Sequence, residues 1–188
     1  MKKIPDNAKK VFEGEHFVVW QWDQELFDKT HTIFESVTRA DVSTTIAITR
    51  EKKILFLKEE QSGKSIMYTF PSGTLDQGDT PLSCAKRELK EETGYTTNDI
   101  TLWYTKSAGN SVIYDYHIFI AKDCTKDGDQ ELDSGEKIQV FEHTLDELLA
   151  IIEEVDFKNF ALYPILLKAK YSNEYKQELE KLFGIETT

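Results

Sequence analysis

Bulky side chains on both faces set the first predicted strands apart from the rest of the chain. In residues 17–22, Phe17, Val19 and Gln21 alternate with Val18, Trp20 and Trp22, so both faces carry bulky side chains. This pattern predicts a strand, and a second strand is expected at 32–38, after a turn around 27–29. An isolated hairpin cannot bury two apolar faces. It must therefore pack on the core, on a second subunit or on a stacked base.

Beyond this hairpin, apolar runs predict six strands, and helical spacing with capping residues predicts four helices. The strands are expected at 42–48, 53–57, 65–70, 100–104, 111–121 and 138–141. The helices are expected at 81–93, 144–152, 157–170 and 173–183, with Pro164 near the start of its helix or at a kink. Polar segments at 58–63 and 123–137 are predicted loops. We divide the chain into an N-terminal β segment, residues 1–41, and a main domain, residues 42–188.

Composition and charge exclude several classes of protein. The 188 residues suit one domain with a small appendage, and the net charge of −11 argues against nucleic acid held on a basic surface. No apolar run follows the N-terminal lysines, and no stretch is long enough for a membrane span. The two cysteines, Cys84 and Cys124, lack the spacing of a zinc or redox motif. We expect a cytoplasmic, reduced protein that binds neither nucleic acid nor membrane.

The helix at 81–93 carries the sequence's clearest chemistry. Thr80 can cap its start, Pro81 suits its first position, and Gly94 offers a left-handed end. One predicted face is apolar, with Leu82, Ala85 and Leu89. The opposite face carries Cys84, Glu88, Glu91 and Glu92. Cys84 lacks a nearby base and is interpreted as a packing residue.

Three carboxylates within one helical turn repel each other, so the helix needs a compensating charge. A hard divalent cation, Mg²⁺ or Mn²⁺, is the best candidate because such ions prefer carboxylate and carbonyl oxygens. Arg87 lies beside the cluster and can reach back to Asp79 in the preceding loop. The alternative is a solvated acidic helix face with no ligand. The adjoining glycine loop, helix cap and arginine favour the metal site.

The stretch from Phe70 to Tyr95 resembles the Nudix box, G-x5-E-x7-R-E-U-x-E-E-x-G-U, in which U is a bulky aliphatic residue. The matching positions are Gly73, Arg87, Glu88, Leu89, Glu91, Glu92 and Gly94, with the spacing intact. Asp79 stands where the pattern has glutamate, and Tyr95 stands where it has an aliphatic residue. The resemblance implies an α/β/α sandwich with a mixed β-sheet, preceded by the small antiparallel β segment.

The same resemblance implies metal-assisted hydrolysis of a nucleoside diphosphate linked to another group. Carried over by position, Glu88 and Glu92 are the main metal ligands and Glu91 is a third. A carbonyl of Ser72 or Gly73 completes the site, and Arg87 orients the glutamates. Asp79 and Gly94 have structural roles in the motif. Bound metal neutralises a diphosphate and lowers the pKa of the attacking water.

The chain is most similar to the ADP-ribose and nucleoside diphosphate sugar pyrophosphatase branch. In that branch an N-terminal β segment builds a homodimer and part of the nucleobase pocket, which makes Trp20 and Trp22 candidates for base stacking. Interface or core packing is an equally good interpretation of both tryptophans. Lys58 and Gln61 stand where the branch often has substrate-binding arginines, and Lys58 could still meet a phosphate. Gly109 lies in a segment, 107–110, that resembles the branch's Ser-Pro-Gly turn.

A glutamate on the loop at 123–137 helps to activate water in this branch. Glu136 is the first candidate, with Asp133 and Glu131 as alternatives, and the competing interpretation is a mobile solvated loop. The expected function is cleavage of a nucleoside diphosphate sugar or ADP-ribose-like compound to a nucleoside monophosphate and a sugar phosphate.

Three other functions stay open. One is a housecleaning hydrolase of nucleoside triphosphates or dinucleoside polyphosphates, which the N-terminal aromatic hairpin disfavours. Another is a non-catalytic nucleotide-sugar sensor, which has no need of the three intact glutamates. A scaffold protein would leave the carboxylates without a purpose.

Overall fold

A mixed β-sheet forms the centre of the computed structural model, which describes residues 4–109 and 111–186. Eleven strands are found in these residues, and the main path runs in the order β1-β2-β3-β10-β4-β5-β11. The strands are β1 (Lys9–Glu13), β2 (Val18–Glu25), β3 (His31–Thr38), β4 (Val42–Thr49), β5 (Ile54–Gln61), β6 (Met67–Thr69), β7 (Ser72–Thr74), β8 (Tyr95–Thr96), β9 (Asp99–Ala108), β10 (Val112–Lys126) and β11 (Glu136–His143). Strand β10 is parallel to β3 and β4 and antiparallel to β9, so the sheet is mixed as expected.

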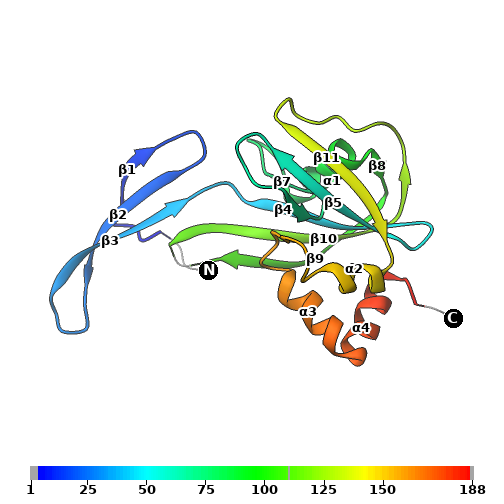
Figure 1. Ribbon diagram of the computed structural model, residues 1–188. Coiled ribbons are helices and arrows are strands. Elements are labelled where there is room, and N and C mark those ends of the chain that lie inside the picture. Colours follow the sequence, from blue (N-terminus) through cyan, green and yellow to red (C-terminus); the bar gives the residue numbers. More distant parts are fainter. Residues whose placement is uncertain (1–3, 110, 187–188) are drawn as a thin grey trace.

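Four helices cover the two faces of this sheet. They are α1 (Pro81–Thr93), α2 (Leu145–Ile151), α3 (Tyr163–Tyr171) and α4 (Asn173–Phe183). Helices α2, α3 and α4 gather on one side of the long strand β10, and α1 lies on the other side, with β5 and β11 (Figure 1). No helix within the described ranges combines the length and the apolar character needed to cross a membrane.

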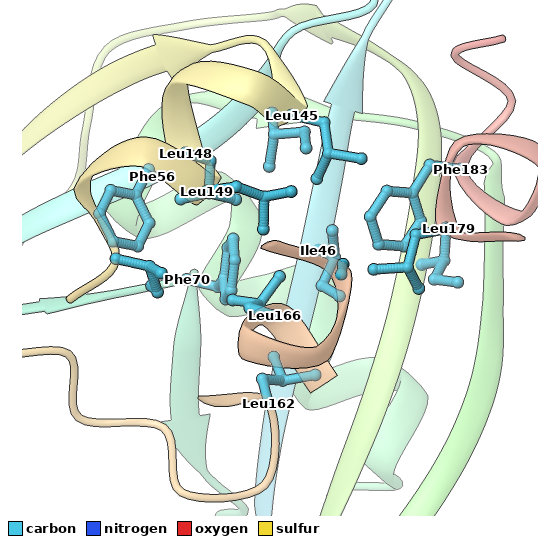
Figure 2. Close-up of a cluster of buried hydrophobic side chains, with 14 of the residues drawn as sticks. Ile46, Phe56, Phe70, Leu145, Leu148, Leu149, Leu162, Leu166, Leu179 and Phe183 are labelled. Carbon is cyan, nitrogen blue, oxygen red and sulfur yellow. The ribbon is translucent and has the colours of Figure 1, made fainter. Parts of the chain in front are cut away.

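The buried strand β4 separates two hydrophobic clusters because neighbouring side chains on a strand point to opposite faces. Ile46 and Ile48 join the larger cluster, against α2, α3 and α4, where Figure 2 shows Leu145, Leu166 and Phe183. Ala47 lies in the smaller cluster, with Leu89 of α1. This arrangement confirms the α/β/α sandwich. All eight residues of β4 are buried, including its serine and threonines, because both faces of this strand are covered.

The N-terminal strands β1, β2 and β3 form an antiparallel sheet that projects from the main body (Figure 1). It joins the body through two register pairs between β3 and β10, of which one is Val37 with Val112. The predicted hairpin is confirmed, and β1 adds a strand that was not predicted. Large apolar side chains remain exposed on this sheet, among them Phe12 at 58% and Ile33 at 60%.

Several predicted boundaries are wrong. Helix α3 begins at Tyr163, not at residue 157, because Pro164 can occupy only its first turn and Asn159 organises the turn before it. Residues 58–61 of the predicted loop at 58–63 are instead the end of β5, which pairs with β11 as far as Gln61. Strand β10 likewise runs to Lys126, into the segment predicted as a loop.

Candidate active site

Helix α1 has the start and the end that its sequence predicts. The Thr80 hydroxyl accepts a hydrogen bond from the Ser83 backbone amide at 3.1 Å, and the Ser83 hydroxyl accepts one from the Thr80 backbone amide at 2.8 Å. Gly94 ends the helix at φ 71°, with its amide bonded to the Lys90 carbonyl at 2.7 Å. The conformation of Gly94 is left-handed, as expected.

The predicted faces of α1 are partly wrong. Leu82 is 40% exposed, whereas Cys84, placed on the acidic face by the sequence pattern, is completely buried. Burial raises the pKa of the Cys84 thiol to about 11. This environment confirms a packing role for Cys84 and disfavours a thiolate nucleophile.

The carboxylates of α1 open onto a cavity of about 510 Å³. Three elements besides α1 contribute to its lining, namely β5, β7 and the segment that leads into β11. The lining includes Glu59, Gln61, Ser72, Gly73, Thr74, Arg87, Glu88, Glu91, Glu92, Glu131, Asp133 and Glu136. The structure therefore brings together every residue proposed for the metal site and all three loop carboxylates.

Arg87 is the cation at the centre of this acidic wall. Its Nη1 lies 2.7 Å from Oε1 of Glu88 and 3.1 Å from Oε2 of Glu91. Its Nη2 lies 3.1 Å from Oδ2 of Asp79 and 3.4 Å from Oδ2 of Asp76. The expected contact with Asp79 is confirmed, even though aspartate is shorter than the glutamate of the motif. A planar guanidinium can hold all these carboxylates at once, which an ammonium cannot.

The deeper carboxylates are poorly solvated. Glu92 is 7% exposed and accepts a hydrogen bond from the Ser72 amide at 2.9 Å. Burial, with the nearby Glu88 charge, raises the pKa of Glu92 well above its ordinary value. Burial also raises the pKa of Glu88 to about 7, although Arg87 opposes this rise. Burial therefore disfavours the ionised forms of Glu88 and Glu92 in the absence of further positive charge.

Gly73 shapes the wall opposite Glu88. A Cβ atom at Gly73 would lie 1.9 Å from Oε1 of Glu88, so only glycine leaves room for this carboxylate. The oxygen atoms nearby, from carboxylates and loop carbonyls, are the type that hard divalent cations prefer. In the described residues, no three acidic, histidine or cysteine side chains are arranged to hold one ion. In this arrangement Glu88 and Glu91 are paired with the Arg87 guanidinium.

The segment carrying the loop carboxylates is held against the end of α1. The Asp127 amide donates to the Gly94 carbonyl, and the Glu131 amide donates to the Glu91 carbonyl, both at 2.8 Å. The Gln130 side chain donates to the carbonyls of Glu92 at 2.6 Å and Ile138 at 3.1 Å. These bonds tie the segment to the carboxylate helix, which does not fit a freely solvated loop.

Glu59 is a buried cavity residue that the sequence analysis did not identify. It is 8% exposed, and burial, followed by the charge of Glu136, raises its pKa. The signal was alternation along β5, where Glu59 and Gln61 face the cavity and Lys58 faces away. Assigning 58–63 to a loop concealed this alternation.

Four predicted substrate contacts lie outside the acidic cavity. Trp20 and Trp22 are on β2, where Trp20 donates to the Thr38 hydroxyl at 3.0 Å and Trp22 packs edge-on against Phe34. Lys58 does not line the cavity. Gly109 borders a separate depression, with Arg39 and Asp115, and residue 110 of the same turn lies outside the described residues.

Comparison with known proteins connects this geometry to a family. The chain is 29% identical over 190 residues to ADP-ribose pyrophosphatase of Bacillus subtilis, covering 97% of this chain and 98% of that protein. It is 32% identical over 152 residues to the methanol dehydrogenase activator of Bacillus methanolicus, covering 78% and 81% respectively. The crystal structure of an ADP compounds hydrolase superposes with a TM-score of 0.75 at 22% identity, covering 99% of this chain and 100% of that one.

The family assignment rests on the sequence of the main domain. The family model for the NUDIX domain matches residues 39–163, a range that contains the carboxylate helix, the glycine loop and strands β5 and β11. The expected resemblance is thereby confirmed, and the chain is a hydrolase. This protein belongs to the NUDIX family.

Proposed function

We propose that this hydrolase cleaves the pyrophosphate bond of a nucleoside diphosphate sugar or ADP-ribose-like compound, giving a nucleoside monophosphate and a sugar phosphate. One observation carries the proposal: the cavity beside the glycine loop is lined by six glutamates, Glu59, Glu88, Glu91, Glu92, Glu131 and Glu136. The similarity to ADP-ribose pyrophosphatase over nearly the whole chain supports this substrate class.

The reaction we propose depends on Mg²⁺ or Mn²⁺. Glu88 and Glu92 would hold the metal, with Glu91 as a third carboxylate and a carbonyl of Ser72 or Gly73 completing the set. When bound, such an ion neutralises the diphosphate charge and makes a bound water more acidic. Burial and the neighbouring carboxylates raise the pKa values of Glu88 and Glu92, which supports this role because a bound cation would stabilise their ionised forms.

The chain's own residues orient the reactants and move the proton. Arg87 keeps Glu88 and Glu91 at the cavity wall. Glu136, at the first position of β11, is the proposed general base that takes a proton from the attacking water. Asp133 and Glu131 line the same cavity and are the alternatives for this step.

A second cavity provides space for the rest of the substrate. It measures about 500 Å³, and it shares Thr74 and Asp76 with the acidic cavity. The Arg39 guanidinium lines it, 5.9 Å from the ring of Phe17 and 5.1 Å from that of Tyr114. We place the nucleoside half of the substrate here, because aromatic and guanidinium groups favour flat rings. Trp20, whose indole donates to the hydroxyl of the lining residue Thr38, would support this cavity from the N-terminal sheet.

We also propose that the protein forms a homodimer through its N-terminal sheet. Val11, Phe12, Phe17, Ile33 and Phe34 of the N-terminal sheet are each at least 40% exposed. Such a concentration of exposed apolar side chains is typical of an association surface. A second copy of the chain would cover it.

A substrate panel tests the proposal directly. ADP-ribose, nucleoside diphosphate sugars, nucleoside triphosphates and dinucleoside polyphosphates would be incubated with Mg²⁺ or Mn²⁺ and the products resolved. We expect monophosphate products from the first two classes, and Glu92→Gln should abolish turnover while leaving the fold intact. Preferential cleavage of triphosphates or dinucleoside polyphosphates would replace the proposed substrate class. Metal-dependent binding without cleavage would indicate a sensor.

A further inference from the structure

We infer that Gln61 is a positioning residue for Glu136, holding this carboxylate at the wall of the acidic cavity. The inference rests on the proposed function, in which Glu136 activates water. Gln61 would act in this step through Glu136. Its role would be to keep two mutually repelling carboxylates in a fixed arrangement.

The side-chain amide of Gln61 bridges two acidic residues. Its Nε2 donates to Oε1 of Glu136 at 2.9 Å and also to Oε1 of Glu59. Its Oε1 accepts a hydrogen bond from the Lys64 ammonium group. The amide is thereby oriented from both ends, with its donors toward the carboxylates and its acceptor toward the cation.

This bridge offsets the repulsion between the Glu59 and Glu136 carboxylates. Glu59 is almost fully buried, and Glu136 lies close enough to interact with its charge. Two such carboxylates would turn apart if nothing connected them. An amide supplies one hydrogen to each without adding a cation that would compete with bound metal. Glutamine therefore suits this position better than a charged side chain.

The backbone does not require the Gln61 side chain. Gln61 and Glu136 are register partners in the β5–β11 pairing, and the Ser62 amide donates to the Gly135 carbonyl at 3.2 Å. These backbone contacts hold the strand ends together independently of the amide. Removing the amide should alter the Glu136 carboxylate without separating the strands.

The test uses Gln61→Met, which keeps approximate side-chain size but removes the donors. Gln139→Met is the matched control, because Gln139 lies on the same strand pair, pairs with Lys58 and is exposed. We expect kcat to fall about 10-fold or more in the Gln61→Met variant, because the hydrogen bond that holds the charged Glu136 carboxylate is lost. KM and the melting temperature should stay near wild type, and the control should retain full kcat. A fall in melting temperature that accounts for the lost activity would overturn the inference.

A double-mutant cycle then asks whether Gln61 acts through Glu136. In a Glu136→Gln background, Gln61→Met should cause little further loss of kcat, because the group that it positions is already gone. If the two losses multiply instead, Gln61 does not act through Glu136.

A crystal structure of the Gln61→Met variant gives a readout independent of activity. We expect the Glu136 carboxylate to turn away from its wild-type position, and an unmoved carboxylate would contradict the inference. If the wild-type protein hydrolyses none of the substrate panel, the proposed function fails. The crystallographic comparison still decides the positioning role in that case.

Discussion

Replacing Glu88 with glutamine should stabilise the metal-free protein while destroying its activity. The Glu88 side chain is only 14% exposed, and burial raises its pKa from 4.5 to about 7 despite the contact with Arg87. The folded protein therefore binds this proton more tightly than the unfolded chain does. The stability that Glu88 contributes is fully present below pH 4.5, and it is lost as pH rises through about 7.

The size of the effect follows from the two pKa values. At pH 8, ionised Glu88 lowers the free energy of unfolding by about 3 kcal/mol relative to its neutral form, and at pH 5 by less than about 1 kcal/mol. Glutamine resembles the neutral form and can still accept a hydrogen bond from Arg87. For a chain of this size, the gain at pH 8 corresponds to a melting temperature about 6–12 °C higher.

Thermal unfolding in the presence of a chelator measures this directly. Wild type and Glu88→Gln would be compared at pH 5 and pH 8, with the exposed Glu60→Gln as the control. The difference in melting temperature between the variant and the wild type should be large at pH 8 and small at pH 5. Mg²⁺ should raise the melting temperature of the wild type more than that of the variant. A variant that melts at or below the wild-type temperature at pH 8 would refute the reasoning.

Three further substitutions probe the surroundings of the carboxylates. Gly73→Ala would place a Cβ 1.9 Å from the Glu88 carboxylate, so kcat should fall about 100-fold with little change in melting temperature, because a flexible side chain can move aside. Gly94→Ala should lower the free energy of unfolding by about 1–3 kcal/mol in urea titrations, because φ is 71° and the added Cβ would meet the Gly128 carbonyl at 2.2 Å. Arg87→Lys should lower kcat/KM about 10-fold or more in steady-state assays, since an ammonium cannot keep every guanidinium contact. Full activity of Gly73→Ala or of Arg87→Lys would contradict the reasoning for that residue. Unchanged stability of Gly94→Ala would contradict the reasoning for Gly94.

The sequence predicted the carboxylate helix well because its signals are local. The Thr80 cap, the proline after it and the Gly94 end all lie within a few residues of the helix that they delimit. Side-chain spacing along one helix likewise placed Arg87 beside Glu88 and Glu91. The exposure of Leu82 was mispredicted because spacing identifies a face without showing how far the neighbouring strand covers it.

The other side of the cavity depends on contacts between distant segments. Glu59 and Glu136 are far apart in the chain, and they meet because β5 and β11 pair in a specific register. The sequence at 58–63 has no apolar residue, so only the continuation of the β5 side-chain alternation beyond Leu57 indicates a strand there, and its hydrogen bonds come from β11. Propensity alone therefore favours a loop there, and tertiary pairing overrides it.

This difference explains the two kinds of residue in the cavity. The residues of α1 belong to a continuous motif, so a sequence pattern can identify them one by one. Glu59 and Gln61 acquire their positions only when the sheet forms, and their chemistry depends on Glu136 arriving opposite them. The carboxylate pair joined by the Gln61 amide therefore cannot be identified from the sequence and requires the structure. The same pairing makes β5 the part of the fold where a change in strand register would disturb the site most.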